Sequence, residues 1–132
     1  MKNVTVHDFS NSQHRQQVIT LWSEVFGYLS AHNEPERVID QKIAVADGLF
    51  FVATSGAEVV GTVMSGYDGH RGWMYSLAVS PAYRRKGLGS LLVRHAEAAL
   101  AARGCMKVNL QVMESNSAVV GFYRALGYEV EP

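Results

Sequence analysis

The sequence is poor in cysteine and proline and carries no surplus of either charge: its 132 residues include one cysteine and three prolines. The single thiol, Cys105, excludes an internal disulfide and a cysteine-based zinc site, and no metal is expected. Twelve basic residues balance twelve acidic ones, which argues against a nucleic-acid partner, because such a partner requires a basic surface. Neither a membrane-length apolar run nor an apolar N-terminal segment is present, so we expect a cytoplasmic protein without a membrane partner.

What is present is the composition of a globular chain. Hydrophobic residues make up 48% of the sequence and charged residues 18%, a balance that disfavours disorder. A chain of this length can bury roughly two thirds of its unfolded surface. We therefore expect residues 1–132 to form one domain.

The spacing of the apolar residues predicts strands that alternate with helices. Strands are expected at residues 3–9, 49–54, 58–66, 73–79 and 107–113, with a stub at 128–131. Helices are expected after Ser10, from near Asn33, from about 87 to 103, and from 116 to 126. Hairpins followed by a strand–helix–strand crossover predict an α/β (α+β) fold with a mixed sheet and helices on its faces.

Local patterns predict how these elements begin, end and face. Ser10 and Gln13 match a capping box at the start of the first helix, and glycines at 27, 104 and 127 are expected to end three helices. Strict alternation in the strand at 73–79 would put one set of side chains on one face: Trp73, Tyr75, Leu77 and Val79. The opposite face would then carry Met74, Ser76 and Ala78.

The most informative stretch is the turn from Ser80 to Ser90, which joins a strand to a long helix and contains Arg84-Arg85-Lys86-Gly87-Leu88-Gly89. Glycines let backbone amides approach a ligand closely, and a helix N-terminus offers unpaired N–H groups and partial positive charge. With three cationic side chains beside it, this turn predicts a phosphate site. The alternative is a solvated basic run on a plain turn. Neither the nucleoside-triphosphate motif nor the dinucleotide motif matches.

Two motifs together resemble those of the GNAT family of N-acetyltransferases. The first is Arg84-x-x-Gly87-x-Gly89 after the strand Leu77–Val79, and the second runs from Asn116 through Phe122-Tyr123 to Gly127-Tyr128. The hairpin at 61–72 further resembles a subgroup of small bacterial acetyltransferases. The resemblance implies a mostly antiparallel sheet, splayed between the strands at 73–79 and 107–113.

The resemblance also implies binding of acetyl-CoA as co-substrate. The pantetheine arm would lie along one strand and the pyrophosphate on the amides of residues 85–90. The implied cofactor-binding residues are Leu77, Ala78, Val79, Arg84, Arg85, Lys86, Gly87, Leu88, Gly89, Ser90, Asn116 and Tyr123.

The activity implied is acetyl transfer to a primary amine of a small molecule or peptide, by direct attack on the thioester. Tyr123 would protonate the departing sulfur, whereas its helical spacing with Phe122 and Leu126 also fits a core stripe. Asn116 would hold the CoA arm or a water, and it also fits an N-cap. The alternative class is a non-catalytic acetyl-CoA-binding sensor or interaction module.

The base and the acceptor contacts are less defined. Some relatives carry a glutamate on the strand at 73–79, which is absent here, so a water relay through Tyr75 or through Glu114 is the hypothesis. His32 and Glu34, with Tyr75, are the candidate substrate contacts. A partner chain could cover the last strand as a homodimer.

Three further side chains are expected to play structural parts. We read His95 and Phe26 as packed residues and Cys105 as a bystander thiol.

Charge is uneven along the chain even though it sums to zero. Residues 32–68 carry a net charge of −4 and residues 71–107 one of +6. The basic stretch contains the proposed phosphate turn, and the acidic stretch contains part of the proposed acceptor side, which suggests a cationic amine.

Overall fold

The computed structural model describes residues 3–27, 34–111 and 117–130. The strands are β1 (Val4–Asp8), β2 (Phe50–Ser55), β3 (Glu58–Tyr67), β4 (Gly72–Val79) and β5 (Val108–Leu110). The α-helices are α1 (Asn11–Phe26), α2 (Glu34–Val45), α3 (Leu88–Ala102) and α4 (Ser117–Ala125), and a short 3-10 turn, η1, spans Pro81–Tyr83.

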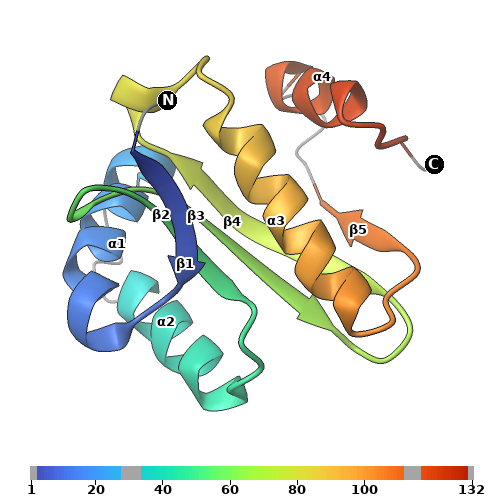
Figure 1. Ribbon diagram of the computed structural model, residues 1–132, viewed down its shortest axis with the longest axis horizontal. Coiled ribbons are helices and arrows are strands. Elements are labelled where there is room, and N and C mark those ends of the chain that lie inside the picture. The colour runs from blue at the N-terminus through green and yellow to red at the C-terminus, as the bar shows by residue number, and fades with distance from the viewer. Residues whose placement is uncertain (1–2, 28–33, 112–116, 131–132) are drawn as a thin grey trace.

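The strands form one sheet in the order β1-β2-β3-β4-β5, as Figure 1 shows. Adjacent strands from β1 to β4 are antiparallel to each other, and β5 is parallel to β4. β5 pairs with the start of β4 only, from Gly72 opposite Val108 to Met74 opposite Leu110. Within the described part of the chain, the rest of β4 has no partner on this side. The predicted mixed, mostly antiparallel sheet is therefore confirmed, and it opens where the splay was expected.

Helices cover both faces of the sheet. α3 crosses one face and packs a mainly aliphatic cluster that includes Leu92, Val93 and Leu100, with α4 beside it. α1 and α2 lie on the other face, where Trp22 and Ile39 are fully buried. The two clusters account for the apolar sides of the predicted helices.

The predicted alternation of β4 is wrong beyond Tyr75. The register with β3 shifts between the pair Thr62–Ala78 and the pair Met64–Tyr75, and Ser76 adopts a left-handed φ of 53°. The extra residue of this β-bulge turns the rest of the strand over. Consequently Tyr75 lies on the α2 side of the sheet, whereas Leu77 and Val79 pack against the cluster on the α3 side.

The ends of the helices agree with the glycine signals but not with the capping box. Gly27, Gly104 and Gly127 have φ values of 69°, 91° and 97°. At the start of α1 the Ser10 side chain makes no cap; instead the Ser10 N–H donates to His14 Nδ1 at 2.9 Å. A histidine one turn into the helix has replaced the expected Ser–Gln pair.

Three other expectations are corrected or limited. Phe26 was expected in the core but is 40% exposed at the end of α1. Residues 128–130 form no strand, so the expected stub is wrong in its described part. The described part of β5 ends at Leu110, and residues 112–116 lie outside the described chain.

Candidate active site

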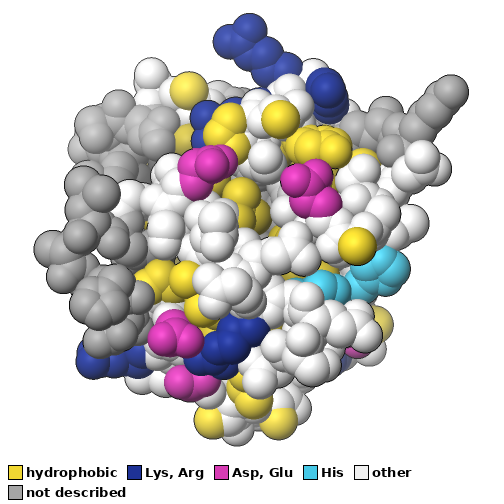
Figure 2. Space-filling view, turned by 90° about the vertical axis from the view of Figure 1, so that its left-hand side faces the viewer, with side chains coloured by type: hydrophobic (Ala, Val, Ile, Leu, Met, Phe, Trp, Pro, Cys, Tyr) yellow, Lys and Arg dark blue, Asp and Glu magenta, His cyan; other side chains and the backbone are white. Residues whose placement is uncertain are grey.

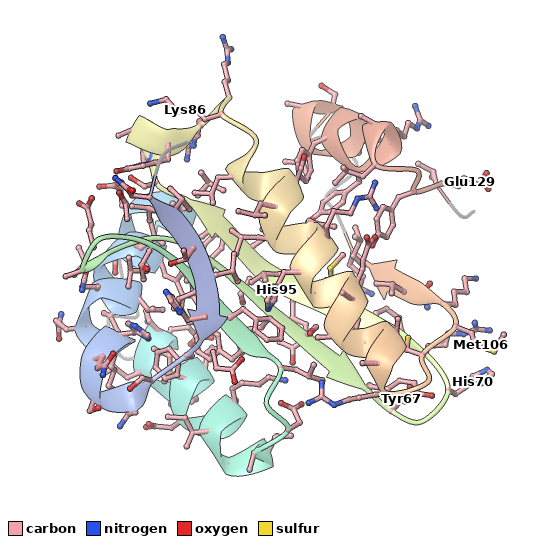
Figure 3. The ribbon with its side chains drawn as sticks, viewed as in Figure 1. Tyr67, His70, Lys86, His95, Met106 and Glu129 are labelled. Carbon is pink, nitrogen blue, oxygen red and sulfur yellow. The ribbon has the colours of Figure 1, made fainter. Side chains whose placement is uncertain are left out.

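The basic turn leads directly into the N-terminus of α3. Arg84, Arg85 and Lys86 are exposed, and Gly87 takes the helix-capping position with a φ of 82°. The helical hydrogen-bond ladder begins where Leu91 N–H donates to Gly87 O at 3.0 Å, so the amides of residues 88–90 lie outside it. Figure 3 shows Lys86 at this end of the molecule. Three cations and a helix N-terminus thus coincide, as an anion site requires.

Beyond Met74, the edge of β4 that has no partner among the described residues runs toward this turn. Ser80 N–H donates to Val60 O on β3 at 2.8 Å, and Val79 lies opposite Gly61. Because the Ser80 N–H bonds to β3 and successive strand residues point their backbone groups to opposite sides, Val79 directs its N–H toward the open edge, whereas Ala78 faces β3. Leu77 adjoins the β-bulge, where this regular alternation is interrupted.

Gly89 also has a packing role that sequence reasoning missed. A Cβ at this position would lie 3.1 Å from Cζ of the Phe122 ring on α4. The absent side chain is what lets α4 rest on the first turn of α3. The glycine thus couples the proposed phosphate site to the helix that carries Tyr123.

Tyr123 is buried beside two other rings. It is 9% exposed and meets Phe122 and Tyr128 edge-on, with centroids 5.0 and 5.6 Å away. Burial raises the pKa of the Tyr123 phenol to about 12. The phenol is therefore protonated throughout the neutral range, as a proton donor must be.

The segment after α4 is held to α3 by polar contacts. Tyr128 Oη donates to Glu97 Oε2 at 2.6 Å. Arg94 bridges the same carboxylate at 2.7 Å and donates to Leu126 O at 3.0 Å. Burial first, and then the Glu97 hydrogen bond, raise the pKa of Tyr128. These contacts fix the ring that packs against Tyr123.

On the other side of the sheet, Tyr75 is bound to a buried lysine that sequence reasoning missed. Lys42 on α2 is 7% exposed, and its ammonium donates to Tyr75 Oη at 3.0 Å. Lys42 falls one turn after Ile39, on the apolar side of its helix; that position could have marked it as buried.

Some of the remaining predicted residues lie within the described part of the chain and others lie outside it. Glu34 is exposed at the start of α2, while three lie outside the described residues: His32, Glu114 and Asn116. His95 is half-buried and meets Phe51 edge-on at 4.6 Å, in agreement with a packed histidine (Figure 3). Cys105 Sγ donates to Lys107 O at 3.2 Å.

On the α1 side of the molecule, Figure 2 shows Lys and Arg side chains at the upper end and also lower down, beside acidic side chains. On this side Arg15 of α1 forms ion pairs with Glu36 and Asp40 of α2, at 3.5 and 2.8 Å. Across the described residues, no three His, Cys, Asp or Glu side chains gather as a metal site. No helix in the same residues is long and apolar enough to span a membrane.

Comparison with known proteins identifies the class that this fold and site define. The sequence profile of the Acetyltransferase (GNAT) family matches residues 15–128. The chain therefore belongs to the GNAT acetyltransferase family, as its motifs predicted. It is 46% identical over 116 residues to the acetyltransferase SG1711 of Sodalis glossinidius, an alignment that covers 88% of this chain and 81% of that protein.

Solved structures share the fold at lower identity. The PaiA N-acetyltransferase of Thermoplasma acidophilum, solved with coenzyme A, matches 97% of this chain and 91% of its own, with a TM-score of 0.84 and 19% identity. A protein of Pyrococcus horikoshii described as an acetyltransferase matches 99% of this chain with a TM-score of 0.84 and 14% identity; this chain spans 45% of its length.

Proposed function

We propose that this protein is an N-acetyltransferase that moves the acetyl group of acetyl-CoA to a primary amine of a small molecule or peptide. The observation that carries the proposal is the edge of β4, without a partner in the described part of the chain, that leads into the cationic N-terminus of α3. An extended ligand with a phosphate-bearing end needs these two features in this order. The T. acidophilum relative of the same fold was solved with coenzyme A.

In this proposal the backbone does most of the cofactor binding. The amides of Leu77 and Val79 bond the pantetheine arm as an added strand would, and Ala78 is kept as a cofactor contact on the family motif alone. The amides of residues 85–90 receive the pyrophosphate, and Arg84 and its two basic neighbours supply charge. Asn116 is kept as a cofactor contact on the family motif alone.

The chemical step is direct attack. The amine nitrogen bonds to the thioester carbonyl carbon, an N–H at Leu77 or Val79 stabilises the oxyanion, and the C–S bond breaks. Tyr123 donates its proton toward the departing sulfur. A free thiol has a pKa of about 8.5, below that of Tyr123, but an apolar site raises the pKa of the thiol as well. The shift of the thiol narrows the difference between the pKa values of donor and leaving group, whereas burial of Tyr123 widens it.

The amine must lose a proton before it attacks, because an alkyl amine has an unperturbed pKa of about 10.4. A water relay is the proposed route, with Tyr75 or Glu114 as the group that orders the water. His32 and Glu34 are proposed to contact the acceptor. The reaction is assigned to the cytoplasm, and homodimerisation stays a prediction.

The test is release of free thiol from acetyl-CoA with amino acids, polyamines, aminoglycosides and peptide N-termini as acceptors. The proposal expects turnover with at least one acceptor class. Tight acetyl-CoA binding without turnover across the panel would instead support the sensor or interaction module, which the missing strand glutamate favours. A protein that shows neither acetyl-CoA binding nor turnover would contradict both proposed functions.

A further inference from the structure

Lys42 lies at the centre of a buried polar cluster on the α2 side of the sheet. Its ammonium donates to Asp47 Oδ2 at 2.8 Å, to Ser65 O at 2.5 Å and to Tyr75 Oη at 3.0 Å. An ammonium has three hydrogens, and all three are used. Since a buried unpaired lysine is strongly unfavourable, these three bonds hold the ammonium in place.

Tyr75 is held in place although it is 41% exposed. The ammonium also lies 5.4 Å from the centroid of its ring, a cation–π distance. Gly66 on β3 lies beside both groups, because a Cβ there would meet Tyr75 Oη at 3.4 Å and Lys42 Nζ at 4.0 Å, which are ordinary contact distances. The exposed phenol is therefore preorganised rather than free to rotate.

The direction of the hydrogen bond decides what this phenol can do. Tyr75 Oη accepts from Lys42, and within the described residues Lys42 is its hydrogen-bond partner. The phenol hydrogen is left to donate outward, and a cation behind the oxygen strengthens that donor while weakening the oxygen as a proton acceptor. Tyr75 is thus suited to bind an oxygen atom rather than to take a proton from an amine.

The position of Tyr75 places this donor at the proposed acceptor side. It directly follows Met74, the last residue of β4 paired with β5, and so stands at the head of the open edge. Leu77 is two residues further along, at most about 7 Å in a strand. Tyr75 precedes the bulge, and strand alternation puts it on the face opposite Met74, a member of the α3 cluster.

From these observations, and resting on the proposed function, we infer that Tyr75 and Lys42 select an acceptor amine with a carboxylate or carbonyl oxygen close to its nitrogen, as in amino acids and peptide N-termini. Tyr75 contacts that oxygen, and Lys42 is a positioning residue that fixes and polarises the phenol. The phenol hydrogen of Tyr75 is then donated to the oxygen of the acceptor substrate rather than to a relay water. Asp47 neutralises Lys42, so the selection comes from the phenol hydrogen bond.

The experiment uses pairs of acceptors that differ by one carboxylate: leucine with isoamylamine, and phenylalanine with 2-phenylethylamine. A hydrogen bond to a charged group contributes a factor of about 10 to 100, so Tyr75→Phe should lower kcat/KM for the amino acids by about that factor. The matched amines should lose less, because they lack the oxygen that the phenol contacts. Comparing each pair in both proteins cancels differences in amine basicity.

Two variants serve as controls. Tyr67→Phe removes a phenol from the neighbouring strand and should leave both members of each pair unchanged. Lys42→Met should reduce the preference for amino acids as Tyr75→Phe does; its melting temperature is measured in parallel, because Asp47 and Ser65 O lose their partner. A purely structural role of Lys42 would lower the melting temperature without altering the preference.

The possible outcomes distinguish a failure of the inference about Tyr75 from a failure of the proposed function. A wild-type protein that prefers the bare amines, or a Tyr75→Phe protein that loses both members of a pair equally, overturns the inference and leaves acetyl transfer intact. The equal loss would assign Tyr75 to the water relay. Absence of thiol release with every amine would overturn the proposed function together with the inference.

Discussion

On the α3 side of the sheet the buried side chains are mainly aliphatic, and the proposed chemistry uses the buried phenol of Tyr123. On the α1/α2 side a histidine, a lysine and a threonine are buried: His14, Lys42 and Thr62. The first side positions a helix N-terminus and a strand edge, so its ligand groups are backbone amides. The second positions side-chain groups. A shared cofactor can be bound by backbone, whereas an acceptor needs side chains that differ between relatives.

The largest expected effect concerns the α3 side. Tyr123→Phe removes the proposed proton donor and keeps the ring, so kcat should fall about 100-fold, at the lower end for a general acid. Acetyl-CoA affinity should stay within about twofold of wild type. Steady-state kinetics and calorimetric titration provide the two values. Full turnover with normal binding would remove Tyr123 from the mechanism.

The raised pKa of Tyr123 also predicts a pH dependence of stability. The folded pKa of about 12 exceeds the unfolded value, so the protonated phenol stabilises the fold at neutral pH. This contribution, about 2–3 kcal/mol, is complete below pH ~10 and is lost as pH rises toward ~12. Urea titrations at several alkaline pH values measure it. The Tyr123→Phe protein should show a correspondingly smaller loss.

A substitution on the α1/α2 side of the sheet should lower stability more than it weakens cofactor binding. Trp22 Nε1 donates to Thr62 Oγ1 at 2.8 Å, and Thr62 in turn donates to Ser76 O at 3.0 Å. Thr62→Val leaves both partners unsatisfied and should lower the free energy of unfolding by about 2 kcal/mol. Because Ser76 O belongs to the β4 bulge, we also expect a lower kcat. An unchanged urea midpoint would show that these buried bonds contribute nothing net.

The contact between α3 and α4 is tested by Gly89→Val. The larger side chain collides with Phe122, which should displace α4, weaken acetyl-CoA binding about tenfold and lower kcat, a loss of about 1.4 kcal/mol in binding. Gly121→Ala is the matched control on α4, since its Cβ meets nothing within 4 Å. That control should be neutral or stabilising by up to about 1 kcal/mol. Equal behaviour of the two variants would remove the proposed coupling.

The smallest effect is expected from Tyr128→Phe. Loss of the hydrogen bond to Glu97 should lower stability by about 1 kcal/mol and kcat several-fold, because the ring beside Tyr123 is less firmly held. Glu97→Gln should do the same, and the double variant should lose less than the sum of the two. Strict additivity would mean that the two residues act independently.

The features that could be predicted from the sequence are those that depend on local patterns. Strand positions and the glycines that end helices could be predicted, because period and backbone freedom are local properties. The bulge at Ser76 could not, since it depends on register with β3 and on Thr62, which bonds the Ser76 carbonyl. Lys42 was missed because its three partners come from separate parts of the chain. At Ser10 the local pattern was right about the helix start but wrong about the group that caps it.

The most direct test of the cofactor assignment is an amide NMR titration of the protein with coenzyme A. We predict large shifts for Leu77, Val79 and the amides of residues 88–90, with a smaller shift for Ala78, whose N–H faces β3. Shifts confined to the α1/α2 side, or equal shifts along β4, would contradict the account of the open edge and the α3 N-terminus as the cofactor site.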